Sequence, residues 1–434
     1  GGAASSNPAA DLSPPPRGAA RRSLLVATAA APSCSDLVAA APPAAGARSS
    51  AAAHVPVPAA SARASGAAAP HMFQAPPQEE VRARLLRGST EQYLVMSPVS
   101  SAHVVGLLAE GDATVRRRVI ACVRPIVHRV MTNRYPVFLA LLHACNGRVN
   151  ELKDIIGAMC NGKGFLMQFD GKEDHNPKVL RFTYSVVETK RKIKALKELI
   201  RVVAWNRPLC KTLVHGLLRK ERLMVEREGL AVLRHCFTML PYEDCSMIFK
   251  DTLGAIDEIL SSQFGWRCVA VCLENARNGE LKDLEATILT RTSAFAKGRW
   301  SSYFLQHVLR YGSEQFKARI VERVAKDIVE LSVDKFGCYV VEDCFLSTGS
   351  LAGLQRVLDA FLDLHDDDLA VAVKGWYSNY AIQKLLAAGK DHLPVRATEL
   401  ARRIEALPEV VRKHEFAKLV MEIINKLFPA QPIQ

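Results

Sequence analysis

The chain is 434 residues long, with 49% hydrophobic residues, 23% charged residues and a formal net charge of +13. This balance suits a folded protein, and no apolar run approaches the roughly 18–20 residues of a membrane-spanning helix, so a membrane partner is not expected. Residues 1–80 hold five arginines and four acids, so the remaining residues carry a net charge of +12. This charge favours a polyanionic partner such as nucleic acid. A charge that only keeps the protein soluble explains the excess about equally well.

Residues 1–80 are rich in alanine, serine, proline and arginine. The stretch 21–34 resembles a signal peptide, and 1–78 as a whole resembles a plastid transit peptide. The biased composition of this segment favours a third interpretation, a disordered low-complexity tail. The chain begins with glycine, so the start of the protein could lie upstream of residue 1.

From residue 81 onward, the sequence shows helical periodicity with almost no strand alternation. The clearest helical patterns cover 115–131, 192–205, 317–331 and 411–428. Proline and glycine stand between these patterns more than within them. The predicted fold class is therefore all-α.

A repeat of 36 residues runs through the second half of the chain. The aligned stretches are REGLAVLRHC (227–236), QFGWRCVAVC (263–272), RWSSYFLQHV (299–308), KFGCYVVEDC (335–344) and WYSNYAIQKL (376–385). Their third residue is always small: Gly229, Gly265, Ser301, Gly337 and Ser378. The last spacing is 41 residues, and we expect the extra five in the acidic loop at 364–369. A regular period of this size predicts stacked helical units, an α-solenoid.

The period predicts how the solenoid is divided. Regular repeats should cover about 216–400, and a C-terminal cap about 401–430. Repeats at about 100–215 are degenerate: 133–145 fits with Pro136 at the small position, whereas 175–182 fits poorly and 207–217 is out of phase.

The second helix of each unit carries a recurring triad of side chains. At about 100° per residue, Cys338, Tyr339 and Glu342 gather on the side opposite the apolar residues, so we expect them to face outward. Matching triads are Asn379, Tyr380 and Gln383, and Ser302, Tyr303 and Gln306. Aromatic rings alternating with polar groups suit the unstacked bases of single-stranded RNA. Half-buried tyrosines beside solvated polar residues, without any RNA, would give the same sequence pattern.

Three of these stretches resemble a known family. KFGCYVVEDC, RWSSYFLQHVLRYG and YSNYAIQKLL are similar to the second helices of Pumilio (PUF) RNA-binding repeats, well over about 290–390 and weakly over 100–220. Residues 111–145 resemble the start of plant Pumilio domains. The resemblance implies a right-handed α-solenoid, a crescent with RNA on its concave face and one base per repeat.

The resemblance also implies a role for each triad residue. In the family the outer two touch the base edge and the middle one stacks, so Tyr303, Tyr339 and Tyr380 would stack. Asn379 with Gln383 would favour uracil, Cys338 with Glu342 guanine, and Ser302 with Gln306 adenine. Because the family binds RNA antiparallel to its repeats, the three together imply a core of 5′-UGA-3′.

Earlier units depart from this pattern, which confines base reading to the C-terminal half. Trp266 and Arg267 could stack, but Ala270 has no hydrogen bond to offer. The two preceding triads are Leu230, Ala231 and Arg234, of which Arg234 could meet a phosphate, and Val137, Phe138 and Leu141, with Phe138 as a possible stacker.

Motifs for enzymatic chemistry are absent from the sequence. It has no phosphate-binding loop, no G-x-S-x-G and no H-E-x-x-H, and both NGKGF (161–165) and HDDD (365–368) are typical of plain loops. Its eleven cysteines form no C-x-x-C pair and suit the core of a protein in a reducing compartment. We expect no enzyme activity, cofactor, metal or small-molecule substrate.

The favoured hypothesis is a divergent Pumilio-type protein that binds single-stranded RNA, in 3′ untranslated regions of mRNA, and lowers translation or mRNA stability through protein effectors in the cytoplasm. Two alternatives remain open. One is a helical-repeat scaffold that binds proteins and has lost its RNA affinity. The other is a nucleolar relative that acts in ribosomal RNA processing. A plastid location is a less favoured option than the cytoplasm.

Overall fold

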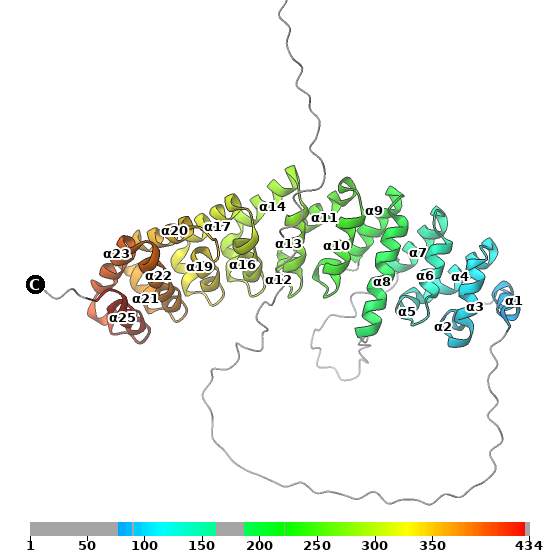
Figure 1. Ribbon diagram of the computed structural model, residues 1–434, viewed down its shortest axis with the longest axis horizontal. Helices are drawn as coiled ribbons and strands as arrows, with labels where there is room; N and C mark the ends of the chain where they lie inside the picture. Colours follow the sequence, from blue (N-terminus) through cyan, green and yellow to red (C-terminus); the bar gives the residue numbers. More distant parts are fainter. Residues whose placement is uncertain (1–76, 89–90, 162–185, 221, 430–434) are drawn as a thin grey trace, which may run out of the picture. The chain divides into compact units, whose positions relative to one another are not determined.

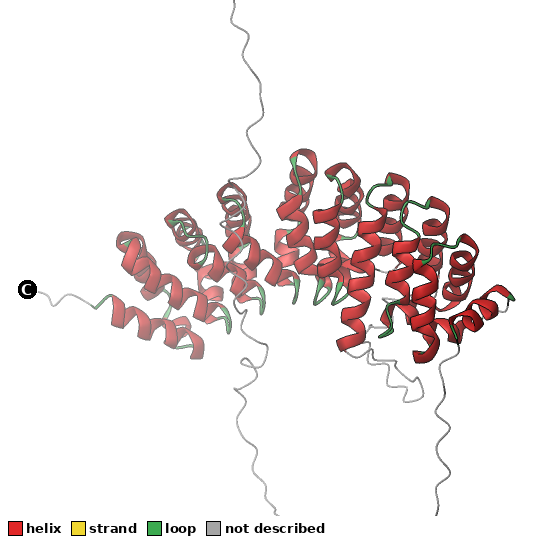
Figure 2. Cartoon of the chain, turned by 45° about the vertical axis from the view of Figure 1, so that its right-hand side comes forward, coloured by secondary structure: helices red, strands yellow, loops and turns green. Residues whose placement is uncertain are grey.

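A computed structural model describes residues 77–88, 91–161, 186–220 and 222–429, and within these ranges the chain consists of helices and loops alone (Figure 2). The predicted all-α class is therefore confirmed. All described helices belong to one unit, Phe73–Gln434, and none of them is long and apolar enough to cross a bilayer. The tail expected at 1–80 falls outside the described residues except at its end, where helix α1 begins at Gln78.

The longer helices of this unit form two rows of successive neighbours (Figure 1). In what we call the front row, each described helix contacts the next: α3 (Pro98–Ala109), α6 (Val137–Ala144), α8 (Val186–Val203), α10 (Gly229–Met239), α13 (Gly265–Asn275), α16 (Ser301–Tyr311), α19 (Gly337–Leu346), α22 (Ser378–His392) and α25 (Glu415–Leu427). Repetition of this contact is what defines a solenoid.

The back row is built in the same way, and apart from α1 each of its helices follows a helix of the front row along the chain. It comprises α1 (Gln78–Leu86), α4 (Ala113–Val123), α7 (Val149–Asn161), α9 (Arg207–His215), α11 (Tyr242–Gly254), α14 (Asn278–Thr290), α17 (Glu314–Lys326), α20 (Leu351–Leu362) and α23 (Pro394–Glu405). The stretch 207–217 was out of phase with the repeat because most of it forms a back-row helix.

Short helices connect the back row to the next helix of the front row. They are α2 (Gln92–Met96), η1 (Arg124–Ile126), α5 (Val127–Thr132), η3 (Gly216–Lys220), η4 (Leu223–Val225), α12 (Ile256–Ser261), α15 (Thr292–Lys297), α18 (Ile328–Val333), α21 (Asp366–Lys374) and α24 (Glu409–Arg412). From α10 to α22, each unit is a front helix, a back helix and one such short helix.

The small residue of the repeat motif marks a close approach of two helices. A Cβ at Gly229, Gly265 or Gly337 would collide with the backbone carbonyl six residues earlier, within the preceding short helix. Ser301 and Ser378 stand at the same place and donate their hydroxyl to that same carbonyl, of Phe295 and Ala372 respectively. The motif therefore preserves the geometry of the turn from short helix to front helix.

Two sequence expectations need correction. The patterns at 115–131, 317–331 and 411–428 are each divided: α4 ends before Pro125, which has no backbone N–H to donate, and the others break near Asp327 and Lys413. Periodicity continued across these breaks because both flanking helices face one core.

The five extra residues of the last repeat do not sit in one loop at 364–369. They are spread over the 347–350 turn, the 363–365 turn and a longer α21.

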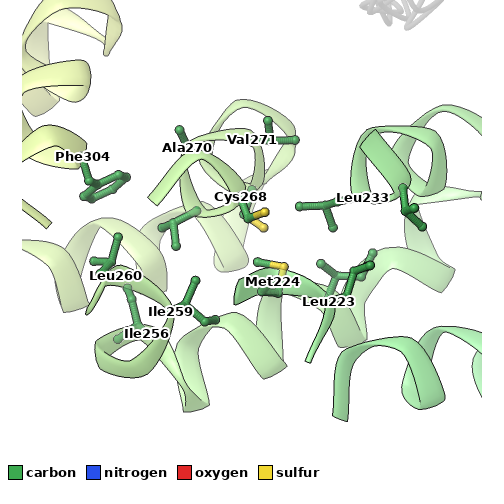
Figure 3. Packing of buried hydrophobic residues seen from close by; sticks show 14 of the residues in the cluster. Leu223, Met224, Leu233, Ile256, Ile259, Leu260, Cys268, Ala270, Val271 and Phe304 are labelled. Carbon is green, nitrogen blue, oxygen red and sulfur yellow. The ribbon is translucent and has the colours of Figure 1, made fainter. Parts of the chain in front are cut away.

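Adjacent units bury a continuous apolar core. Figure 3 shows this core between α10 and α16, where the labelled side chains are Leu223, Met224, Leu233, Ile256, Ile259, Leu260, Cys268, Ala270, Val271 and Phe304. Each unit alone would leave this surface in water, so stacking is the source of stability.

Candidate nucleic-acid interface

Three tyrosines stand exposed on consecutive helices of the front row. Tyr303, Tyr339 and Tyr380 are each the third residue of α16, α19 and α22, and they are 39%, 45% and 54% exposed. Burial raises the pKa of Tyr339 above its usual value, and the neighbouring Cys338 and Glu342 add to the effect. The aromatic row that the repeat alignment predicts is thus open to solvent.

The first residue of each triad lies beneath this surface, not on it. Ser302, Cys338 and Asn379 are all buried. Each donates to a carbonyl just before its own helix: Ser302 Oγ to Arg299 at 3.3 Å, Cys338 Sγ to Lys335 at 3.5 Å and Asn379 Nδ2 to Gly375 at 3.0 Å. The expectation that Cys338 faces outward with Tyr339 is therefore wrong for the cysteine, because the helical wheel cannot tell how deep a neighbouring helix packs.

The third residue of each triad is partly or fully enclosed. Gln306 and Gln383 are half-buried, and Gln383 Nε2 donates to Asn379 Oδ1 at 3.0 Å. Glu342 is only 8% exposed, which also departs from the outward position predicted for it. The polar groups therefore form a floor between the exposed rings, and the half-buried Gln306 and Gln383 amides are its most accessible part.

Both acids of α19 are held by cations from neighbouring front-row helices. Lys384 on α22 donates from Nζ to Glu342 Oε2 at 2.5 Å. Arg310 on α16 contacts Asp343 Oδ2 at 3.0 Å. Each pair is neutral in sum, but its cation is the exposed member, because the side chains of Arg310 and Lys384 are 47% and 51% exposed and those of their acids 9% and 10%. Sequence reasoning missed Lys384, although it directly follows Gln383 in the repeat.

Cys338 stays a neutral thiol beside the Glu342 carboxylate. Burial, followed by the Glu342 charge, raises its pKa to about 12. A protonated thiol is a small, weak hydrogen-bond donor and not a nucleophile. Among the described residues there is also no cluster of side chains that could hold a metal ion.

Helix α13 presents a different surface. Arg267 is exposed, and its guanidinium lies 4.8 Å from the centre of the Trp266 ring. Trp266 itself is half-buried, with its ring centre 5.8 Å from that of His307 on α16. Ala270 is buried. Arg267 thus occupies the place in the row that the tyrosines occupy in later units.

The earliest units lack an aromatic row. Leu230 and Ala231 on α10 are half-buried and Arg234 is exposed. On α6, Val137, Phe138 and Leu141 are all buried, so Phe138 is not available as a stacker. The exposed residue of α6 is His143 instead, which contacts Glu198 on α8 at 2.8 Å.

A basic stripe on α8 takes the place of the aromatic row in that unit. Lys190, Lys194, Lys197 and Arg201 recur at helical spacing on one side, and the first two are exposed without an ion pair among the described residues. Arg201 pairs with Glu198. These four basic residues follow one another at spacings of four, three and four residues. Sequence reasoning did not use this signal.

Comparison with known families and proteins finds repeats of one kind. A model of the Pumilio-family RNA binding repeat matches residues 292–325 and 327–347. A Pumilio domain-containing protein of Schizosaccharomyces pombe is 20% identical over 258 residues, which is 58% of this chain and 36% of that protein. Pumilio homolog 8, chloroplastic, of Arabidopsis thaliana is 26% identical over 194 residues, 44% of this chain and 37% of that protein. The chain thus spans about a third of the length of these relatives.

Solved structures share the fold. The Puf4 RNA binding domain bound to the HO endonuclease RNA 3′ UTR recognition sequence superposes with a TM-score of 0.52 at 15% identity, covering 76% of this chain and 97% of that one. PUF-6 in complex with 5BE13 RNA gives a TM-score of 0.50 at 14% identity, covering 80% and 99%. Residues 292–325 and 327–347 thus match Pumilio-family repeats, and the helical solenoid shares its fold with these RNA-binding domains.

Proposed function

We propose that the chain binds single-stranded RNA on the front row, and that α16, α19 and α22 read a core of 5′-UGA-3′. The observation that carries the proposal is the row of exposed tyrosines at the same position of three adjacent helices. Stacking of a base on an aromatic ring is worth about 1–3 kcal/mol, and it needs a ring that is free on one face. Packing of the solenoid alone gives no reason to leave three rings in water.

The floor between the rings supplies the base-edge contacts. Gln383 with Asn379 would meet uracil, and Gln306 with Ser302 would meet adenine. Glu342 would meet guanine, because a carboxylate accepts from the ring N–H and the amino group of that base. Its Oε1 accepts no hydrogen bond from the described residues. The buried Ser302, Cys338 and Asn379 would act chiefly by shaping the slot.

The proposed cellular role rests on similar proteins. Puf4 has been crystallised with a 3′ UTR sequence, and a Caenorhabditis elegans relative, 24% identical over 207 residues, is named fem-3 mRNA-binding factor 2. These similarities support binding to 3′ untranslated regions of mRNA. Repression of translation or mRNA stability through protein effectors, in the cytoplasm, is the corresponding role for this chain.

A protein scaffold is the second candidate. A cleft of about 450 Å³ opens on the back row between α17 and α20, lined among others by Lys317, Thr348 and Arg356. A peptide could occupy such a cleft while the front row stays empty. The exposed cations beside the tyrosines, Lys335 and Lys384, favour RNA binding over this alternative, since phosphates can reach them.

Selection of RNA from a random pool by the full chain, followed by sequencing, tests the proposal. We expect enrichment of a UGA-containing core, and a shift away from guanine at its second base in Glu342→Gln. Glu274→Gln is the matched control, because Glu274 is an exposed acid on α13 outside the triad. Absence of any enriched sequence, with weak binding that salt abolishes and neither variant alters, would leave the scaffold as the better account.

A further inference from the structure

Lys384 lies where the base opposite Glu342 would be bound. It follows Tyr380 by four residues on α22, so the two side chains share one face of that helix. Its ammonium reaches across to α19 and contacts Glu342 Oε2 at 2.5 Å, while the side chain stays 51% exposed. A base stacked between Tyr339 and Tyr380 would therefore meet a carboxylate and an ammonium side by side.

The other groups around this slot carry no charge. Cys338 is a neutral thiol, and Asn379 and Gln383 are amides bonded to one another. Asp343 on α19 is turned to Arg310 on the opposite side. The Glu342–Lys384 pair is thus the one charged pair among the described residues that joins α19 to α22.

An ammonium has three donors, and the contact with Glu342 uses one of them. Guanine presents O6 as an acceptor next to its ring N–H and amino group, and the last two suit a carboxylate. We infer that Lys384 is a specificity-determining residue, whose ammonium is held by Glu342 and donates to O6 of guanine. This inference rests on the function proposed above. Together the two residues complement the whole Watson–Crick edge of that base.

The same ammonium disfavours adenine. Adenine presents an amino group where guanine has O6, so a donor would face a donor. A lysine that only neutralised Glu342, or only contacted a phosphate, would change the affinity for every base alike. The ratio of affinities for guanine and adenine therefore distinguishes a base-reading lysine from these two other roles, whereas the affinity for one base does not.

The test measures binding of the full chain to three oligonucleotides by fluorescence anisotropy. They differ only at the second base of the core, which is guanine, inosine or adenine. Inosine keeps O6 but lacks the amino group, so it reports on Glu342 alone. In Lys384→Met we expect the preference for guanine over adenine to fall about tenfold, as for loss of a hydrogen bond to a charged group, while guanine over inosine stays unchanged.

Three further variants serve as controls for this result. Glu342→Gln should lower the preference for guanine over inosine. Lys384→Arg keeps a cation and should keep most of the preference over adenine. Arg310→Met breaks the comparable pair to α19 away from the slot, so it should lose similar thermal stability and leave both ratios unchanged.

Two outcomes would overturn the inference. An unchanged or increased guanine-over-adenine ratio in Lys384→Met would mean that the lysine competes with the base for Glu342 instead of assisting. An equal loss of that ratio in Arg310→Met would reduce the effect to general destabilisation. If the wild type bound all three oligonucleotides equally, the proposed function would fail and the inference with it, which is a distinct result.

Discussion

Replacement of Gly337 by alanine tests the reason for the repeat's small position. The new Cβ would lie 2.5 Å from the Leu331 carbonyl oxygen and 3.1 Å from its Cα, whereas real Cβ contacts essentially never fall under 3.0 Å. Backbone must therefore move, because no flexible side chain can yield. Overpacking of this kind costs about 1–3 kcal/mol, and the higher helix propensity of alanine returns up to about 1 kcal/mol. We expect a net loss of about 1–2 kcal/mol.

Gly254→Ala is the matched control. Gly254 ends α11, and a Cβ there would meet nothing within 4 Å, so this variant should be neutral or slightly more stable. Thermal unfolding followed by circular dichroism compares the two, at about 2 °C per kcal/mol for a domain of this size. We expect Gly337→Ala to melt a few degrees below both Gly254→Ala and the wild type. Equal midpoints would refute the close approach of α18 and α19 as the reason for the small residue.

Further predictions concern binding and pH. Tyr339→Ala should weaken binding of a UGA oligonucleotide by about 1–3 kcal/mol in fluorescence anisotropy, because a stacking face is lost. Changing Lys190 and Lys194 together to glutamine should reduce the slope of log K against log salt by about 1.4, measured with an oligonucleotide extended on its 3′ side. Burial and a nearby lysine lower the pKa of His128 from 6.5 to about 4. As the pH falls, this imidazole is therefore protonated in the unfolded chain before it is protonated in the folded one. Stability should fall as pH drops from about 6.5 to 4, by at most about 3 kcal/mol, and His128→Gln should flatten this dependence in urea unfolding.

Each of these has a result that contradicts it. Tyr311 is 52% exposed on α16 but outside the tyrosine row, so Tyr311→Ala should bind like the wild type; an equal loss there would argue against stacking at Tyr339. An unchanged salt slope would exclude α8 from the RNA path. An identical pH dependence in His128→Gln would assign the acid sensitivity to other groups.

The sequence by itself determined the fold class, the repeat and the row of rings. These follow from local patterns: helical periodicity, a small residue every 36 positions, and a tyrosine two residues after it in three units. A front-row helix begins at each of these small residues, so the tyrosine takes the same place on every one of the three helices. The resemblance to Pumilio repeats rests on the same short stretches.

Tertiary structure alone decided which polar groups remain reachable and what holds them. The helical wheel placed Cys338 and Glu342 beside Tyr339, but packing of adjacent units buries both and leaves only the ring exposed. The partner of Glu342 lies 42 residues away on another helix, and nothing in the local pattern encodes a pair across that distance. Burial and long-range pairing depend on how two helices approach, and a period read along one helix carries no information about that.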